Sequence, residues 1–155
     1  DMVKELENFV DVLKKYEVNV FRPKLIKDYN QIFTRDIGFV IDNFFFKSNI
    51  LPKRAKEFHG ISSILSNFRN KIVTMPQDIH IEGGDVLYHS NTIFVGYYDC
   101  DDYSDLFTAR TNKAALDYFI DFFSKKNVKG FHLNKSLTNP KKKYTSFRLL
   151  FTNYR

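Results

Sequence analysis

HIEGGDVL, residues 80–87, places two acids around a pair of glycines just ahead of an apolar, β-prone run. Because glycine has no Cβ, Gly83 and Gly84 allow a sharp turn and a close approach of another group to the backbone. Such a turn would present Glu82 and Asp85 toward a common space, since burying them unpaired would be costly. The residues alone leave two interpretations open: a strand-entry turn with two solvated acids, or an acidic binding site.

A second stretch of the same kind, NQIFTRDIGF at residues 30–39, again sets an acid, Asp36, at the mouth of an apolar strand. The hydrophobic spacing around it predicts a ββαβ unit. Its expected elements are a strand at 37–41, a turn at 42–43, a returning strand at 44–46, a helix at 54–68 and a strand at 71–75.

The stretch at 80–87 opens a second unit with the same plan. Its expected elements are a strand at 85–88, a turn at 90–91, a strand at 92–96, a helix at 112–125 and a strand at 128–133. The step from Asp36 to Asp85 is 49 residues, and a repeat of this length indicates units that bury their apolar faces against one another. A helix at 3–15 and a strand at 17–22 come before the two units and are expected to belong to an earlier one.

Together, the motifs FTRD and IEGGD resemble those of the guanidine-modifying enzymes: the arginine deiminases, dimethylargininases and amidinotransferases. The resemblance covers about residues 16–140. It implies an α/β fold, the pentein-type α/β propeller, in which five ββαβ modules surround a central channel that holds the substrate. This chain would supply a partial ring of about two and a half modules, within a domain at residues 1–143.

The resemblance also implies roles for individual residues. Asp36 of FTRD would grip the substrate guanidinium, and Phe33 would lie against its plane, which fits cation–π attraction. Glu82 of IEGGD would be a catalytic residue that works with a histidine. A carboxylate–histidine pair moves protons, and a cysteine thiolate attacks the guanidinium carbon, which is a poor electrophile.

An arginine-like substrate also carries an α-carboxylate, which the family holds with Arg and Asn side chains. The matching positions are Asn30, Arg54 and Arg110, and Asp85 joins the same substrate-binding set. Each residue has an ordinary structural explanation when taken alone; Asp36, for example, could be a turn acid paired with its neighbour. The two motifs and the repeat together favour the site.

The resemblance breaks at the catalytic base and nucleophile. The family requires an HLD segment and a later cysteine, whereas His132 is followed by Leu and Asn inside an expected strand. Cys100 lies in the sequence DCDD, where three acids disfavour the thiolate. We therefore expect this chain to lack both groups and to be inactive alone. The sequence predicts no cofactor and no metal site, because one cysteine and dispersed histidines lack ligand spacing.

The tail at residues 144–155 matches nothing in the family. One choice of codons for residues 143–151, shifted by two bases, spells Asn-Ile-Leu-His-Leu-Asp-Cys, which contains the missing HLD segment. The run of lysine codons at 141–143 would be a natural place for a slip. We infer that the tail is a frameshifted segment of a truncated enzyme.

The composition of the chain indicates which kinds of partner to expect. With 155 residues, 43% of them hydrophobic, the chain is long enough for one core. The net charge of +6 comes from scattered lysines, so we expect no nucleic-acid partner. The resemblance implies a small-molecule guanidine as the partner. The single cysteine, the lack of a membrane-spanning run and the lack of a signal peptide favour the cytoplasm. Exposed sheet edges favour self-association.

The alternative function is a non-catalytic binding or interaction module of the same fold, for which the basic surface would favour RNA as the partner.

Overall fold

The computed structural model describes residues 1–29, 31–101 and 110–133. Within these ranges the strands form two three-stranded sheets, β1-β2-β3 and β4-β5-β6. In each sheet the first two strands are antiparallel and the third runs parallel to the second. The strands are β1 (Gly38–Ile41), β2 (Phe44–Lys47), β3 (Ile72–Thr74), β4 (Val86–His89), β5 (Thr92–Tyr97) and β6 (Asn127–His132). The predicted ββαβ repeat and the mixed α/β class are confirmed.

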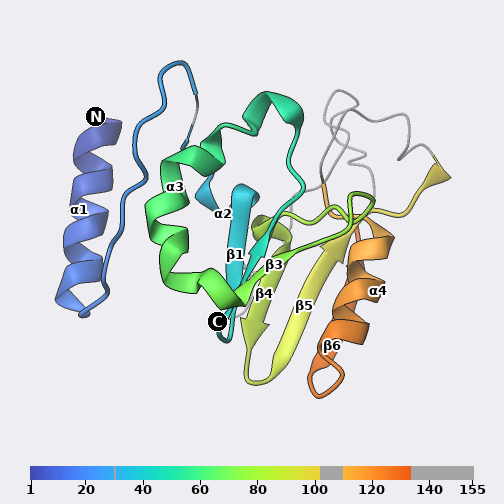
Figure 1. The fold of residues 1–155 in the computed structure, drawn as a ribbon. Coiled ribbons are helices and arrows are strands. Elements are labelled where there is room, and N and C mark those ends of the chain that lie inside the picture. The colour runs from blue at the N-terminus through green and yellow to red at the C-terminus, as the bar shows by residue number, and fades with distance from the viewer. Residues whose placement is uncertain (30, 102–109, 134–155) are drawn as a thin grey trace.

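Two helices precede β1, a third lies between β2 and β3, and a fourth lies between β5 and β6 (Figure 1). The α-helices are α1 (Met2–Lys15), α2 (Thr34–Ile37), α3 (Glu57–Leu65) and α4 (Lys113–Phe122). Short 3-10 turns occupy η1 (Pro52–Arg54), η2 (Ser66–Lys71) and η3 (Gly83–Asp85). The helix predicted at 54–68 is therefore an α-helix between two 3-10 turns, and the strand predicted from residue 37 begins one residue later, after α2.

Both hairpins close through two-residue turns at the predicted positions. Asp42, Ser90 and Asn91 have φ values of 52°, 45° and 64°, in the left-handed region that Asp and Asn tolerate better than most residues. The registers across the turns pair Ile41 with Phe44 and His89 with Thr92. Such turns match the twist of antiparallel strands, which explains why local sequence was sufficient to predict them.

The strand predicted at residues 17–22 is wrong. Glu17 lies in a turn with a φ of 58°, and residues 18–22 have no strand partner among the residues that the structure describes. Val18 and Phe21 are exposed. An alternating apolar segment becomes a strand only when another backbone pairs with it, and the described part of the chain brings no backbone into that position.

One core joins the two sheets. Phe46 of β2 packs against Phe119 of α4, with ring centroids 4.9 Å apart, and Phe39 of β1 lies 6.0 Å from the same ring. The helix α4 also packs on β5 and β6 of its own sheet. The buried cluster comprises Phe39, Ile41, Phe46, Met75, Ile79, Ile81, Val86, Ile93, Val95, Ala115, Leu116, Phe119 and Phe123. The two modules therefore hold each other in place and fix the positions of their acidic turns.

None of the helices in the described ranges combines the length and the apolar content that crossing a bilayer requires.

Candidate functional site

The two acidic motifs are clamped together through Arg35. Its Nε and Nη2 donate to the Gly83 carbonyl at 3.0 and 2.6 Å, and Nη2 also donates to the Val86 carbonyl at 2.8 Å. A Cβ at Gly83 would lie 2.5 Å from the Arg35 carbonyl oxygen, whereas at Gly84 it would meet only Asp36 Oδ1 at 3.9 Å. The close backbone approach predicted for the glycine pair is thus confirmed at the first glycine.

Asp85 is the most enclosed acid of the site, with 1% of its surface exposed. Thr111 Oγ1 donates to its Oδ2 at 2.8 Å, and Arg110 Nη2 donates to its Oδ1. Burial raises the pKa of the Asp85 carboxyl, and the Arg110 guanidinium and the Thr111 hydroxyl oppose that rise. The structure therefore excludes the solvated-turn interpretation for Asp85.

Glu82 meets the same arginine. Its Oε2 lies 3.2 Å from Arg110 Nη1, and its backbone N–H donates to Thr111 Oγ1 at 3.1 Å. Burial raises the pKa of Glu82 to about 7, although Arg110 lowers it. The nearby carboxylates Asp36 and Asp85 raise it further. A carboxyl with this pKa exchanges its proton near neutral pH.

Asp36 reaches the site from the first module. Its Oδ2 accepts a hydrogen bond from Arg54 Nη1 at 3.0 Å. Arg54 also donates from Nε and Nη2 to the two carboxylate oxygens of Glu57 at 2.7 and 2.8 Å. The hydrogen bond to Glu57 is the main cause that raises the pKa of Arg54. Since the Asp36 charge acts on both Glu82 and Asp85, the three acids form one electrostatic group.

A cavity of about 410 Å³ opens beside this group. It is lined by Asp28, Tyr29, Phe33, Lys53, Arg54 and Glu57. Phe33 is half-exposed and its carbonyl lies 3.5 Å from Arg54 Nη2. The structure thus joins Phe33 and Asp36 through Arg54, and it joins Glu82 and Asp85 through Arg110. Of these residues, Phe33 and Arg54 line the cavity. Asn30 lies outside the described residues.

Three residues that sequence reasoning missed hold the site together: Glu57, Thr111 and Arg35. Glu57 is 3% exposed and fixes Arg54, and its position three residues after an arginine in a helical stretch was the available signal. Thr111, also fully buried, joins both acids of the second motif. No local pattern marks such a residue, because its partners lie 26 and 29 positions away.

His132 contacts the backbone of Asp99, the residue before Cys100. His132 is the last residue of β6, which agrees with its expected place in a strand. Its Nε2 lies 3.3 Å from the backbone nitrogen of Asp99 and 3.2 Å from the backbone carbonyl oxygen of the same residue. Its ring stacks on Tyr98 at 6.3 Å. Cys100 follows Asp99 in the chain and is exposed with a free thiol. The expectation that neither serves as base or nucleophile stays a prediction.

In the described ranges, no group of three or more His, Cys, Asp and Glu side chains is arranged to hold a metal ion. The site presents clustered carboxylates and guanidinium groups, which recognise planar cations and carboxylates through paired hydrogen bonds.

No family model and no curated protein matches the sequence. Solved structures do match. A dimethylarginine dimethylaminohydrolase, as an adduct with 4-chloro-2-hydroxymethylpyridine, is similar with a TM-score of 0.67 and 17% identity, over 88% of this chain and 54% of that chain. The N-terminal domain of ArgZ, an arginine dihydrolase of cyanobacteria, bound to product, is similar with a TM-score of 0.63 and 19% identity. The match covers 84% of this chain and 45% of that chain.

The amidinotransferase SxtG of Microseira wollei, from the saxitoxin biosynthetic pathway, gives a TM-score of 0.61 and 14% identity, over 84% of this chain and 48% of that one. The chain spans about half the length of these three structures. At such low identity the likeness shows the fold. The resemblance to the guanidine-modifying enzymes that the two motifs indicated is confirmed at that level.

Proposed function

We propose that this chain is the substrate-gripping part of an enzyme that acts on an arginine-like guanidine. The observation that supports it is the convergence of Asp36, Glu82 and Asp85 from two modules. Protein guanidinium groups already pair with all three acids, Arg54 with the first and Arg110 with the other two. A set of carboxylates that binds guanidinium groups of the chain has the geometry to bind that of a ligand.

The proposed roles follow the two motifs. Asp36 grips the guanidinium, Phe33 covers its plane, and Glu82, with its pKa near 7, takes part in proton transfer at neutral pH. Arg54 and Arg110, with Asn30, hold the α-carboxylate. Because Arg110 is paired with Glu82 and Asp85, a substrate guanidinium that reaches Glu82 must share these acids with it or displace it.

The complete enzyme is proposed to be an α/β propeller of five modules, of which residues 1–143 supply about two and a half. A cysteine attacks the guanidinium carbon, an amine leaves, and the resulting Cys–amidino intermediate is resolved by water in a hydrolase or by an amine in a transferase. The base and the nucleophile lie in the part of the enzyme that this chain lacks. The tail at 144–155, which lies outside the described residues, is proposed to be frameshifted.

Calorimetric titration of the purified chain tests the binding step. L-arginine and dimethylarginine should bind, and Asp36→Asn and Glu82→Gln, which keep side-chain shape, should each weaken binding at least tenfold. Asp117→Asn, an exposed acid on α4, is the matched control and should bind normally. Binding that is indifferent to both site substitutions would instead favour a non-catalytic interaction module.

A second titration separates the two ends of the substrate. Agmatine has the guanidinium of arginine but no α-carboxylate, so Arg54→Ala should weaken arginine binding and leave agmatine binding nearly unchanged. Equal losses for both ligands would mean that Arg54 acts on the guanidinium end through Asp36. The purified chain should release neither citrulline nor urea, and turnover that Cys100→Ser abolishes would reverse the assignment of that residue.

A further inference from the structure

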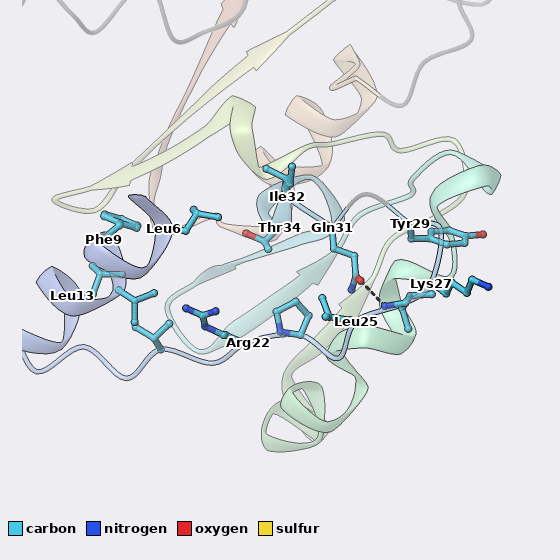
Figure 2. A pocket seen from close by; sticks show the side chains of 14 residues that line it. Leu6, Phe9, Leu13, Arg22, Leu25, Lys27, Tyr29, Gln31, Ile32 and Thr34 are labelled. Carbon is cyan, nitrogen blue, oxygen red and sulfur yellow. Dashed lines mark hydrogen bonds between the residues drawn. The ribbon is translucent and has the colours of Figure 1, made fainter. Parts of the chain in front are cut away.

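Two further cavities of the molecule differ in their chemistry. One, of about 850 Å³, is lined mostly by apolar side chains of α1 and of residues 20–34, among them Leu6, Phe9 and Leu13 (Figure 2). The other, of about 550 Å³, lies where the end of β2, the first turns of α3 and the loop at residues 77–80 meet. We call it the basic cavity, because its polar lining consists of Lys47, Ser48, Asn49, His59, Gln77 and His80.

The basic side chains of this cavity come from three different segments. Lys47 is the last residue of β2, His59 lies in α3, and His80 lies two residues before Glu82. Among the described residues that line the cavity, none carries a carboxylate. Asp78, in the same loop as His80, is exposed and does not belong to the lining. The charge of the basic cavity therefore favours an anion.

The basic cavity is separate from the acidic group, although the turn η1 contributes to both. Arg54 lines the cavity of about 410 Å³ described above, whereas Pro52 and Ala55 line the basic cavity. Glu57, the acid at the start of α3, accepts hydrogen bonds from Arg54 with both carboxylate oxygens, at 2.7 and 2.8 Å. Its charge is therefore paired on the far side of η1.

Hydrogen bonds fix the walls of the basic cavity. The Asn49 Nδ2 donates to the Pro76 carbonyl at 2.6 Å and to the Ile79 carbonyl at 2.8 Å, which ties the segment after β2 to the loop. The backbone N–H of His80 donates to Asn112 Oδ1 at 3.3 Å, and its carbonyl accepts from the Asn112 N–H at 3.1 Å. A site whose walls are already held in place loses less free energy to ordering when a ligand binds.

Two features of the lining indicate the kind of anion. The Lys47 Nζ lies 4.5 Å from the centroid of the Phe58 ring, and Phe58 and Ile50 both line the cavity, so charge and apolar surface adjoin. Ser48 is 2% exposed, and its hydroxyl has no hydrogen-bond partner among the described residues. A buried hydroxyl without a partner is uncommon, and a hydroxyl in a cavity wall is a donor for an oxyanion.

We propose that the basic cavity binds a small organic oxyanion, which is either a phosphate ester or a carboxylate. Lys47 supplies the positive charge, and His59 and Ser48 donate hydrogen bonds to the anionic oxygens. The apolar part of the lining covers the carbon skeleton of the ligand, and the volume of the cavity suits a small molecule. The site is independent of the proposed guanidine site, and its ligand has the opposite charge.

Calorimetric titration with three probes that share one ring tests the proposal. Phenyl phosphate and benzoate carry the two kinds of oxyanion, and phenol keeps the ring without the charge. At about 0.15 M salt, which screens loose surface attraction, at least one of the two anions should bind the full chain with a Kd below about 1 mM. Phenol should not bind. The anion that binds more tightly identifies the class of ligand.

Substitutions test whether the anion occupies this cavity. Lys47→Met keeps the apolar stem and should weaken anion binding about tenfold, the loss expected for one charge-assisted hydrogen bond. His59→Gln, at an exposed position of α3, should weaken it about fivefold. The matched control is Lys129→Met, at an exposed lysine of β6 outside the lining, which should leave the Kd unchanged. Circular dichroism reports whether each variant is folded.

Backbone amide NMR shifts locate the bound anion independently of the variants. Changes concentrated at residues 47–50 and 77–80 would support the site, whereas changes concentrated at residues 82–85 and 110 would place the anion on the acidic group and overturn the proposal. It is also overturned if neither anion binds the folded chain, if phenol binds as tightly as the anions, or if binding survives both Lys47→Met and His59→Gln.

Discussion

The helices α1 and α4 have similar local chemistry and opposite surroundings. Each is amphipathic and has a capped N-terminus: Asp1 accepts from the Val3 N–H at 3.1 Å, and Asn112 accepts from the Ala115 N–H at 3.0 Å. Only α4 buries its apolar side chains. The difference teaches that spacing and caps are enough to form a helix here, whereas burial depends on a sheet that the rest of the chain must provide.

The largest expected effect separates the two helices directly. Phe119→Ala leaves a cavity between the sheets and should lower the free energy of unfolding by about 4 kcal/mol. Phe9→Ala removes an exposed ring and should change it by less than about 0.5 kcal/mol. Urea denaturation followed by circular dichroism measures both, and equal losses would show that α1 is packed in solution.

The comparison extends to arginines. Arg110→Ala leaves the buried Asp85 without its cation and should cost about 3 kcal/mol of unfolding free energy. Arg22→Ala breaks a pair with Glu7 at 2.9 Å in which both side chains are more than half exposed, and should cost less than about 1 kcal/mol. The same denaturation experiment applies; a small loss for Arg110→Ala would mean that water solvates Asp85.

A pH series tests the same difference between the packed and the exposed parts of the molecule, because Glu82, the acid with the raised pKa, lies in the packed part. Burial raises the pKa of Glu82 from 4.5 to about 7, so the folded state holds a proton that the unfolded state releases. The contribution of Glu82 to stability should be greatest below about pH 4.5 and should be lost as pH rises to about 7, a change of up to about 3 kcal/mol. Glu82→Gln should flatten this dependence; a slope that survives the substitution must come from another group.

The smallest expected effect compares the two caps. Asn112 also accepts from the His80 N–H at 3.3 Å and donates to the Asp78 carbonyl at 2.8 Å, so Asn112→Ala should cost about 1.5 kcal/mol. Asp1 caps α1, which has no buried residues. Asp1→Ala should therefore lower the free energy of unfolding by only about a few tenths of a kcal/mol. Asn112→Asp, which retains the accepting oxygen, should recover part of the loss in thermal melts.

The sequence predicted well whatever depends on neighbours in the chain. The turns at Asp42 and Ser90 tolerate left-handed backbone, and the helix at α4 shows an uninterrupted apolar face, so their positions followed from short segments. The segment at residues 17–22 has an equally good strand pattern, yet it is not a strand. Pairing is a property of two backbones, and the sequence of one does not contain the other.

The candidate site divides in the same way. The motifs identified Asp36, Glu82 and Asp85, which the structure brings into one electrostatic group. Glu57 resembled any exposed acid in a first helical turn, and Thr111 resembled a loop residue. Both residues are buried in the structure. Glu57 binds Arg54, and Thr111 binds Asp85, which lies 26 positions away in the sequence. The spacing of residues does not predict this burial.

The clamp made by Arg35 has a kinetic consequence. Its guanidinium joins the helical turn that carries Asp36 to the carbonyls of Gly83 and Val86 on either side of Asp85. The acids of the two modules therefore keep their spacing before any ligand arrives. For a cation that bridges Asp36 and Glu82, association requires no rearrangement of these turns, only that the side chains of Arg54 and Arg110 share or give up their pairs with the acids. The association rate should fall as salt screens the attraction of the acids.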